Sequence, residues 1–197
     1  MDLSSKSFTD IMLHAEDTNY YDIRKKCEGS LRYDFSRGVA SMEKFLNQNS
    51  VRDSLGVGKI HFVSCSTKVS LAMFVDWMRN LEIGIPPLLE DGTNLLVYAG
   101  EYDLMGNWLV GNSRLVRAME WSGQKEFATS LKVPFVVDGS EAELLKIYGP
   151  LSFLKVHDVG HMVPMDQPKV ALKMLKKWIN GTLAKSRAHK EKLFADM

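Results

Sequence analysis

The sequence has almost no excess of charge, and no apolar run in it approaches the length of a membrane span. Its 25 Lys and Arg residues stand against 24 Asp and Glu residues, which gives a formal net charge of +1. This balance points to neither nucleic acid nor an acidic membrane as a partner. Residues 1–17 have no cationic start followed by an apolar stretch, so we predict no secretory signal there.

Cysteine is scarce, since Cys27 and Cys65 are the only two in the chain. Neither lies in a C-x-x-C motif or beside clustered histidines, which argues against a zinc site. A disulfide between them stays open, but two unpaired or buried thiols are the simpler expectation. His157 precedes His161 by four residues on a strand-to-loop segment rather than a helix, which disfavours a two-histidine metal site. We therefore expect no metal and no cofactor.

The composition is that of an ordinary soluble globular domain. The 197 residues are 45% apolar and 25% charged, enough for one domain with a real core. We find no internal repeat, low-complexity tract or interdomain linker. The expected organisation is a poorly ordered lead-in over 1–19, a domain over 20–183 and a charged tail over 184–197.

Hydrophobic patterning predicts helices that alternate with strands. The run at 95–99 is continuously apolar, as is typical of a strand buried on both faces of a parallel sheet. The alternation favours an α/β fold, although the strands are too few for a complete doubly wound domain. The predicted helices cover 42–55, 69–81, 108–121 and 168–183, and the predicted strands cover 59–63, 95–99, 133–137 and 151–156.

Two polar residues follow strand ends in a way that suggests chemistry. Asp103 comes just after the strand at 95–99, and His161 comes just after the strand at 151–156. Functional groups gather at the carboxyl ends of strands in open α/β sheets. Histidine can take a proton from a nucleophile, and a carboxylate can fix the histidine tautomer. An aspartate that precedes a histidine is also the chain order of these two residues in an α/β-hydrolase triad. The spacing alone leaves open a structural explanation, in which Asp103 is an ordinary loop residue and His161 forms its hydrogen bonds with the backbone.

Several longer strings resemble the C-terminal region of plant serine carboxypeptidases, from about residue 20 to 183. The strings are YDIRKKCEGSL, DWMRNLEIGIPPLLEDG, NLLVYAGEYDL, SFLKV and GHMVPMDQP. The resemblance implies the C-terminal part of an α/β-hydrolase fold, an incomplete and mostly parallel sheet with flanking helices. It implies release of the C-terminal residue of peptides by a Ser-Asp-His triad. The family is secreted or vacuolar and works in acidic compartments, and some plant relatives transfer acyl groups instead.

The resemblance also implies roles for individual residues. Asp103 matches the triad aspartate, His161 matches the triad histidine, and Met162 would line the site near the leaving residue of a peptide substrate. Asn180-Gly181-Thr182 is a glycosylation sequon, which matters only if the chain enters the secretory path. Since no signal is visible, we expect the sequon to be unused.

The nucleophile of the family is missing from these residues. No G-x-S-x-G occurs in the sequence, and the family's serine elbow and oxyanion donors belong to an N-terminal half. We therefore predict no measurable peptidase activity for the isolated chain, unless a complementary N-terminal chain supplies the serine. The alternative is a non-catalytic, degenerate homologue or binding module. An acyltransferase needs the same triad, and the nucleophilic serine is missing for that function too. We also expect the strands at 95–99 and 151–156 to expose an edge and an apolar face.

Other departures from the family pattern concern cysteines and one insertion. By resemblance, Cys27 would pair with a cysteine where Arg32 now stands, and the partner of Cys65 would lie in the N-terminal half. Gly106 replaces a cysteine that follows the triad aspartate. Val110 resembles a one-residue insertion, which in a helix would rotate the following residues by about 100° and disturb the site.

Overall fold

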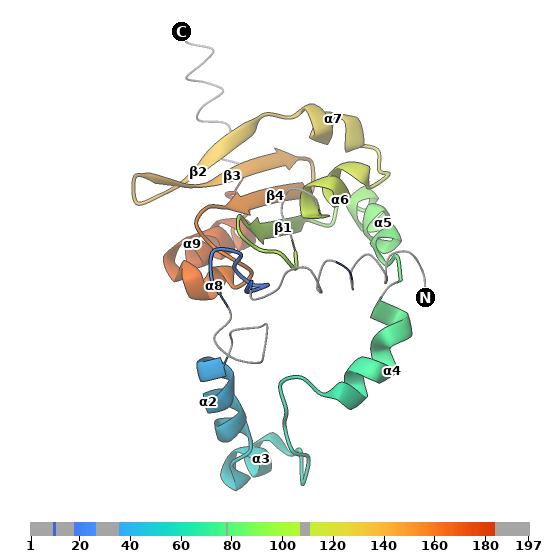
Figure 1. Cartoon of the computed structure of the whole chain (residues 1–197). Coiled ribbons are helices and arrows are strands. Elements are labelled where there is room, and N and C mark those ends of the chain that lie inside the picture. The colour runs from blue at the N-terminus through green and yellow to red at the C-terminus, as the bar shows by residue number, and fades with distance from the viewer. Residues whose placement is uncertain (1–9, 11–17, 27–35, 78, 107–110, 184–197) are drawn as a thin grey trace. The chain divides into compact units, whose positions relative to one another are not determined.

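The computed structural model describes residues 10, 18–26, 36–77, 79–106 and 111–183. Most of the predicted lead-in and all of the predicted tail lie outside these residues, as do Cys27 and Val110. The chain divides into two compact units, one of Met1–Asn19 with Lys26–Asn80 and one of Tyr20–Lys25 with Leu81–Met197. Figure 1 shows their elements.

Among its described residues, the first unit contains the helices α2 (Ser36–Leu46), α3 (Asn49–Leu55) and α4 (Thr67–Trp77). The prediction of one helix over 42–55 is therefore wrong. The helix ends because the Asn47 amide bonds to the backbone of Phe62, accepting from its N–H and donating to its carbonyl, both at 2.8 Å. Those bonds hold the segment around Phe62 outside any sheet, so the predicted strand at 59–63 is also wrong.

The second unit is built on a four-stranded sheet in the order β1-β4-β3-β2. Its strands are β1 (Leu95–Gly100), β2 (Lys132–Val137), β3 (Ser140–Tyr148) and β4 (Leu151–Val156). Only β1 and β4 are parallel, so the sheet is mixed rather than mostly parallel as predicted. The Asp138-Gly139 turn between β2 and β3 has positive φ at both positions, as a two-residue hairpin turn of type I′ requires. The polar start of β3 concealed that strand in the sequence.

Helices cover both faces of this sheet (Figure 1). On one face, α9 (Pro168–Ile179) packs its buried Val170, Ala171 and Met174 against β2, β3 and β4. The other face is covered by α5 (Ile85–Glu90), α6 (Ser113–Ala118) and α7 (Gln124–Thr129). The prediction missed α5 and α7. Pro86 and Pro87 lie in the first turn of α5, where proline is tolerated because no backbone donor is needed.

The strand β1 forms one edge of the sheet, as predicted, whereas β4 is central and buried along its whole length. The expectation of an exposed β4 is therefore wrong, because the β2–β3 hairpin covers its other side. The edge position leaves Tyr98 of β1 42% exposed. A groove of about 400 Å³ runs beside it, lined largely by apolar side chains of β1 and α9 that include Leu96, Leu175 and Trp178.

Within the part of the chain that the structure describes, no helix is long and apolar enough to cross a bilayer. The same residues contain no group of three or more His, Cys, Asp or Glu side chains that could hold a metal ion.

Candidate active site

Asp103 and His161 meet at the carboxyl ends of two adjacent parallel strands. The last register pair of β1 and β4 is Gly100 with Val156, and the chain reaches each polar residue a few positions later. Nδ1 of His161 lies 2.8 Å from Oδ2 of Asp103. An ionised carboxylate only accepts hydrogen bonds, so Nδ1 carries the proton and Nε2 of the neutral ring keeps its lone pair.

The two side chains differ sharply in exposure. The Asp103 side chain is 5% exposed and that of His161 is 41% exposed. Among the described residues, Nε2 of His161 has no hydrogen-bond partner. The arrangement is thus a buried carboxylate that orients an accessible base, which is the geometry needed for proton transfer to and from a reacting group.

The loop after β1 holds the carboxylate of Asp103. The amide of Gly106 donates to its Oδ1 at 3.0 Å, and the side chain of Asn112 donates to the Gly106 carbonyl at 2.6 Å. A Cβ at position 106 would lie 3.0 Å from Oδ2, so a side chain there would crowd the carboxylate. Gly111 and Asn112 are π-helical. The contact between Asp103 and His161 has normal hydrogen-bond length.

A short segment from far upstream, Tyr20–Lys25, lies across both loops. It belongs to the same compact unit as the sheet. Three backbone hydrogen bonds tie it down: from Leu104 N to Tyr20 O at 3.1 Å, from Ile23 N to Tyr102 O at 3.0 Å, and from His161 N to Tyr21 O at 2.6 Å. The segment therefore connects the loop of the carboxylate with the loop of the histidine.

Tyr21 and Gly160 fix the histidine loop. The Tyr21 ring stacks on that of His161, with centroids 4.8 Å apart and planes inclined by 9°. A Cβ on Gly160 would lie 1.9 Å from the Tyr21 carbonyl oxygen, so no side chain fits there. Close approach of the backbone therefore requires glycine at this position, as it does at Gly100, where a Cβ would lie 2.0 Å from the Gly160 oxygen.

Ion pairs reinforce the Tyr20–Lys25 segment. Asp22 is buried and accepts two side-chain hydrogen bonds from Arg24, at 2.9 and 2.8 Å, with Lys25 3.3 Å away. The hydrogen bonds from Arg24 lower the pKa of Asp22 from 3.8 to about 2. Arg24 also donates to the carbonyl of Asp158 at 3.2 Å and lies over the Tyr102 ring at 4.1 Å. This one cation thus links the segment to both strand ends.

A second polar pair joins the ends of β1 and β4. The buried Lys155 forms a salt bridge with the partly buried Glu101, and the amide of Asp158 donates to the same carboxylate at 3.3 Å. Burial alone would raise the pKa of Glu101, but these hydrogen bonds outweigh it and hold the pKa below its usual value. His157 lies 3.5 Å from the carboxylate. The Glu101 carboxylate therefore stays ionised and helps to fix the strand ends that carry Asp103 and His161.

The remaining predicted residues are placed as follows. Met162 is partly buried and directly precedes α8 (Val163–Asp166), beside His161 in the chain. Asn180 is exposed at the end of α9. Cys65, in the other unit, is an exposed free thiol. Sequence reasoning did not single out Tyr21, Asp22 or Arg24, which lie in a segment without hydrophobic periodicity. The only available signal was the YDIRKKC string itself.

Comparison with known proteins identifies relatives over nearly the whole chain. The profile of the serine carboxypeptidase family matches residues 2–181. A serine carboxypeptidase-like protein of Pisum sativum is 75% identical over 190 residues, covering 96% of this chain and 65% of the pea protein. Serine carboxypeptidase-like 49 of Arabidopsis thaliana is 69% identical over 176 residues, covering 89% of this chain and 33% of the relative. The chain thus spans between a third and two thirds of these relatives.

A solved structure resembles this fold. It is that of Kex1(delta)p, a prohormone-processing carboxypeptidase from Saccharomyces cerevisiae, with a TM-score of 0.69 and 24% identity. The match covers 83% of this chain and 36% of the yeast chain. The likeness shows the fold, which is part of an α/β-hydrolase fold, as predicted. The family profile, which matches residues 2–181, establishes that this chain belongs to the serine carboxypeptidase family.

Proposed function

We propose that this chain supplies the general-base half of a serine carboxypeptidase active site, with His161 as the base and Asp103 as its orienting carboxylate. The observation that carries the proposal is the 2.8 Å contact between Nδ1 and Oδ2, which leaves Nε2 accessible. In the reaction, Nε2 takes the proton of a serine hydroxyl as its oxygen attacks the scissile carbonyl. It then returns that proton to the leaving amine, while the buried carboxylate stabilises the imidazolium.

The serine itself comes, in this proposal, from a segment outside these 197 residues. No G-x-S-x-G occurs in the sequence. Ser113 and Ser152 are buried, the first at the start of α6 and the second inside β4, so neither resembles an exposed nucleophile. The isolated chain should therefore release no C-terminal residue from peptides, since it lacks both nucleophile and oxyanion donors.

The complementary segment would dock against the edge of the sheet. β1 is an apolar edge strand, and edge strands offer unpaired backbone groups to a further strand. Beside it, Leu172 and Leu175 of α9 are 53% and 47% exposed, on the apolar groove described above. A strand that extends the sheet at β1 and an apolar element that fills the groove would bury this surface.

The substrate class and the cellular setting follow the family. We propose that the completed site takes peptides, with Met162 beside the leaving residue. A secreted or vacuolar location would expose Asn180 to the glycosylation machinery, and its position at the surface is compatible with a glycan.

A second candidate function is a non-catalytic, degenerate homologue that acts as a binding module. The absence of a nucleophile motif from the sequence favours it. An acyltransferase is a weaker candidate, because it requires the same serine.

A chimeric protein would distinguish the catalytic function from the binding module. This chain would replace the matching 176 residues of the Arabidopsis relative, which would supply the remainder of the protein. We expect the chimera to release the C-terminal residue of a blocked dipeptide at acidic pH, and the His161→Ala chimera to be inactive. An inactive chimera beside an active parent protein would contradict the proposal and favour the binding module.

The isolated chain gives the complementary measurement. The purified chain and its His161→Ala variant should both fail to turn over the same dipeptide. Turnover that the substitution abolishes would instead reveal a nucleophile within these residues.

A further inference from the structure

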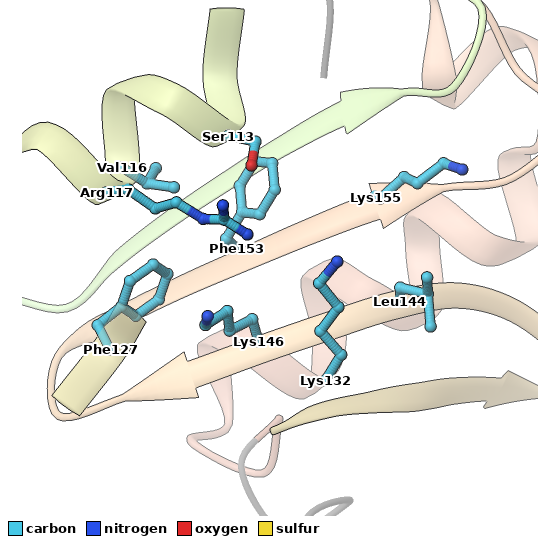
Figure 2. Close-up of a pocket in the computed structure, with 9 residues that line it drawn as sticks. All are labelled: Ser113, Val116, Arg117, Phe127, Lys132, Leu144, Lys146, Phe153 and Lys155. Carbon is cyan, nitrogen blue, oxygen red and sulfur yellow. The ribbon is translucent and has the colours of Figure 1, made fainter. Parts of the chain in front are cut away.

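A small cavity lies between the sheet and helices α6 and α7, on the face opposite α9 (Figure 2). Its volume is about 20 Å³, which is room for one small ion or water molecule. Four of the nine described residues that line it are cationic and none is acidic. The lining residues are Ser113, Val116, Arg117, Phe127, Lys132, Leu144, Lys146, Phe153 and Lys155.

Lys146 forms the floor of this cavity. It is only 5% exposed, and its ammonium donates one hydrogen bond, to the carbonyl of Ala128 at 2.6 Å. The ammonium also lies 5.3 Å from the centre of the Phe127 ring. An ammonium has three donors, and no other acceptor for them is found among the residues that the structure describes. Burying an ammonium with two N–H donors unbonded costs free energy, unless a bound group accepts hydrogen bonds from them.

Two further cations stand at the mouth. Arg117 of α6 and Lys132 of β2 are exposed, and in Figure 2 their charged ends point toward the space between helix and sheet. Lys155 points away from that space and is neutralised by Glu101. Burial lowers the pKa of Lys146, and the positive charges of Arg117 and Lys132 lower it further. The three cations therefore repel one another with no described anion to offset them.

We propose that this cavity binds one small monovalent anion of the size of chloride, held by Lys146 at the floor and by Arg117 and Lys132 at the mouth. A halide accepts hydrogen bonds from any direction, so it can meet the free ammonium donors and the guanidinium together. The aromatic walls, Phe127 and Phe153, suit a weakly hydrated monovalent ion better than a multivalent one. The site contains neither Asp103 nor His161 and does not rest on the proposed function.

The test is the line width of the ³⁵Cl NMR signal, measured with the purified full chain. Binding to the protein broadens this signal, and bromide should remove the broadening by competition. We expect the Arg117→Gln, Lys132→Gln double variant to lose more than half of the excess width. The control variant Lys125→Gln, Lys169→Gln removes the same charge from exposed sites and should keep that width. Circular dichroism verifies that each variant is folded, and both altered mouth positions are exposed.

Three results would overturn the proposal. Equal excess widths in the wild type and in both double variants would mean that chloride associates only with general surface charge. No excess width at all would mean that chloride does not bind to the chain. Displacement of chloride by phosphate as effectively as by bromide would mean an open basic surface rather than a cavity of this size.

Discussion

The ring of Tyr21 lies parallel to that of His161 at 4.8 Å, and its carbonyl oxygen accepts the backbone N–H of the same histidine at 2.6 Å. One residue thus fixes both the ring and the backbone of the proposed base. It belongs to the Tyr20–Lys25 segment, which reaches the site from the other end of the chain. The orientation of His161 therefore depends on this distant segment as well as on Asp103.

Loss of the Tyr21 ring should change the environment of His161 without removing it. In Tyr21→Ala, the NMR signal of the His161 ring proton between its two nitrogens should shift downfield, because ring-current shielding disappears. Tyr21→Phe retains the stacked ring and should leave the signal nearly in place. In the chimera, the alanine variant should lose about two- to tenfold in kcat, since stacked aromatic pairs contribute about 0.5–1.5 kcal/mol. Equal behaviour of the two variants would contradict a positioning role for the ring.

Asp103→Asn should abolish most of the activity of the chimera while preserving its fold. An amide can present its N–H group to Nδ1 and so favour the wrong histidine tautomer. We expect kcat to fall on the order of 10⁴-fold with little change in KM, as in other triads. The measurement is steady-state kinetics on the blocked dipeptide. A loss of less than tenfold would show that this carboxylate does not orient the base.

Gly160→Ala should destabilise the second unit, because its Cβ would lie 1.9 Å from the Tyr21 oxygen. We expect a loss of about 2–4 kcal/mol in the free energy of unfolding, measured in urea, or detachment of the Tyr20–Lys25 segment. Gly84→Ala is the matched control. A Cβ at position 84 would have no atom within 4 Å, and Gly84 has no positive φ, so its alanine should be nearly neutral. Equal effects at the two positions would show that the loop relaxes around the new methyl group.

The strands that carry the site could be predicted because their signals are local. The run at 95–99 and the run at 151–156 became β1 and β4, and their parallel pairing brings together the residues that follow them. Chain order and strand ends suggested that Asp103 pairs with His161, and the family resemblance favoured this pairing over an unrelated loop aspartate and histidine.

The supports of that pair could not be predicted because they are not local. Tyr21 acts through contacts with residues far along the chain, and no hydrophobic periodicity in its neighbourhood marks it. The helix break at Asn47 likewise depends on a side chain that meets Phe62, fifteen positions away. Tertiary hydrogen bonds of this kind override local propensity. The cationic cavity also assembles from α6, β2, β3 and β4, which are separate in the sequence.

The ion pairs of Asp22 make a prediction about pH. Because its pKa falls from 3.8 to about 2 on folding, the ionised carboxylate stabilises the native state above the unfolded pKa. That contribution should be complete near pH 6, decline as the pH falls below about 5, and vanish below about pH 2. The shift corresponds to at most about 2.5 kcal/mol. Since Arg24 is 39% exposed, solvent screening should reduce the effect to about 1–2 kcal/mol.

Urea unfolding of Asp22→Asn between pH 7 and pH 2 measures this contribution. The variant should be less stable than the wild type by that amount at pH 7, and the two curves should converge as the pH approaches 2. Asp76→Asn is the control, since Asp76 and its partner Arg79 are 45% and 66% exposed and their pair should contribute little. A stability difference for Asp22→Asn that stays constant across this range would mean that packing, rather than charge, fixes the segment. The contacts of the Tyr20–Lys25 segment with His161 would then not depend on pH.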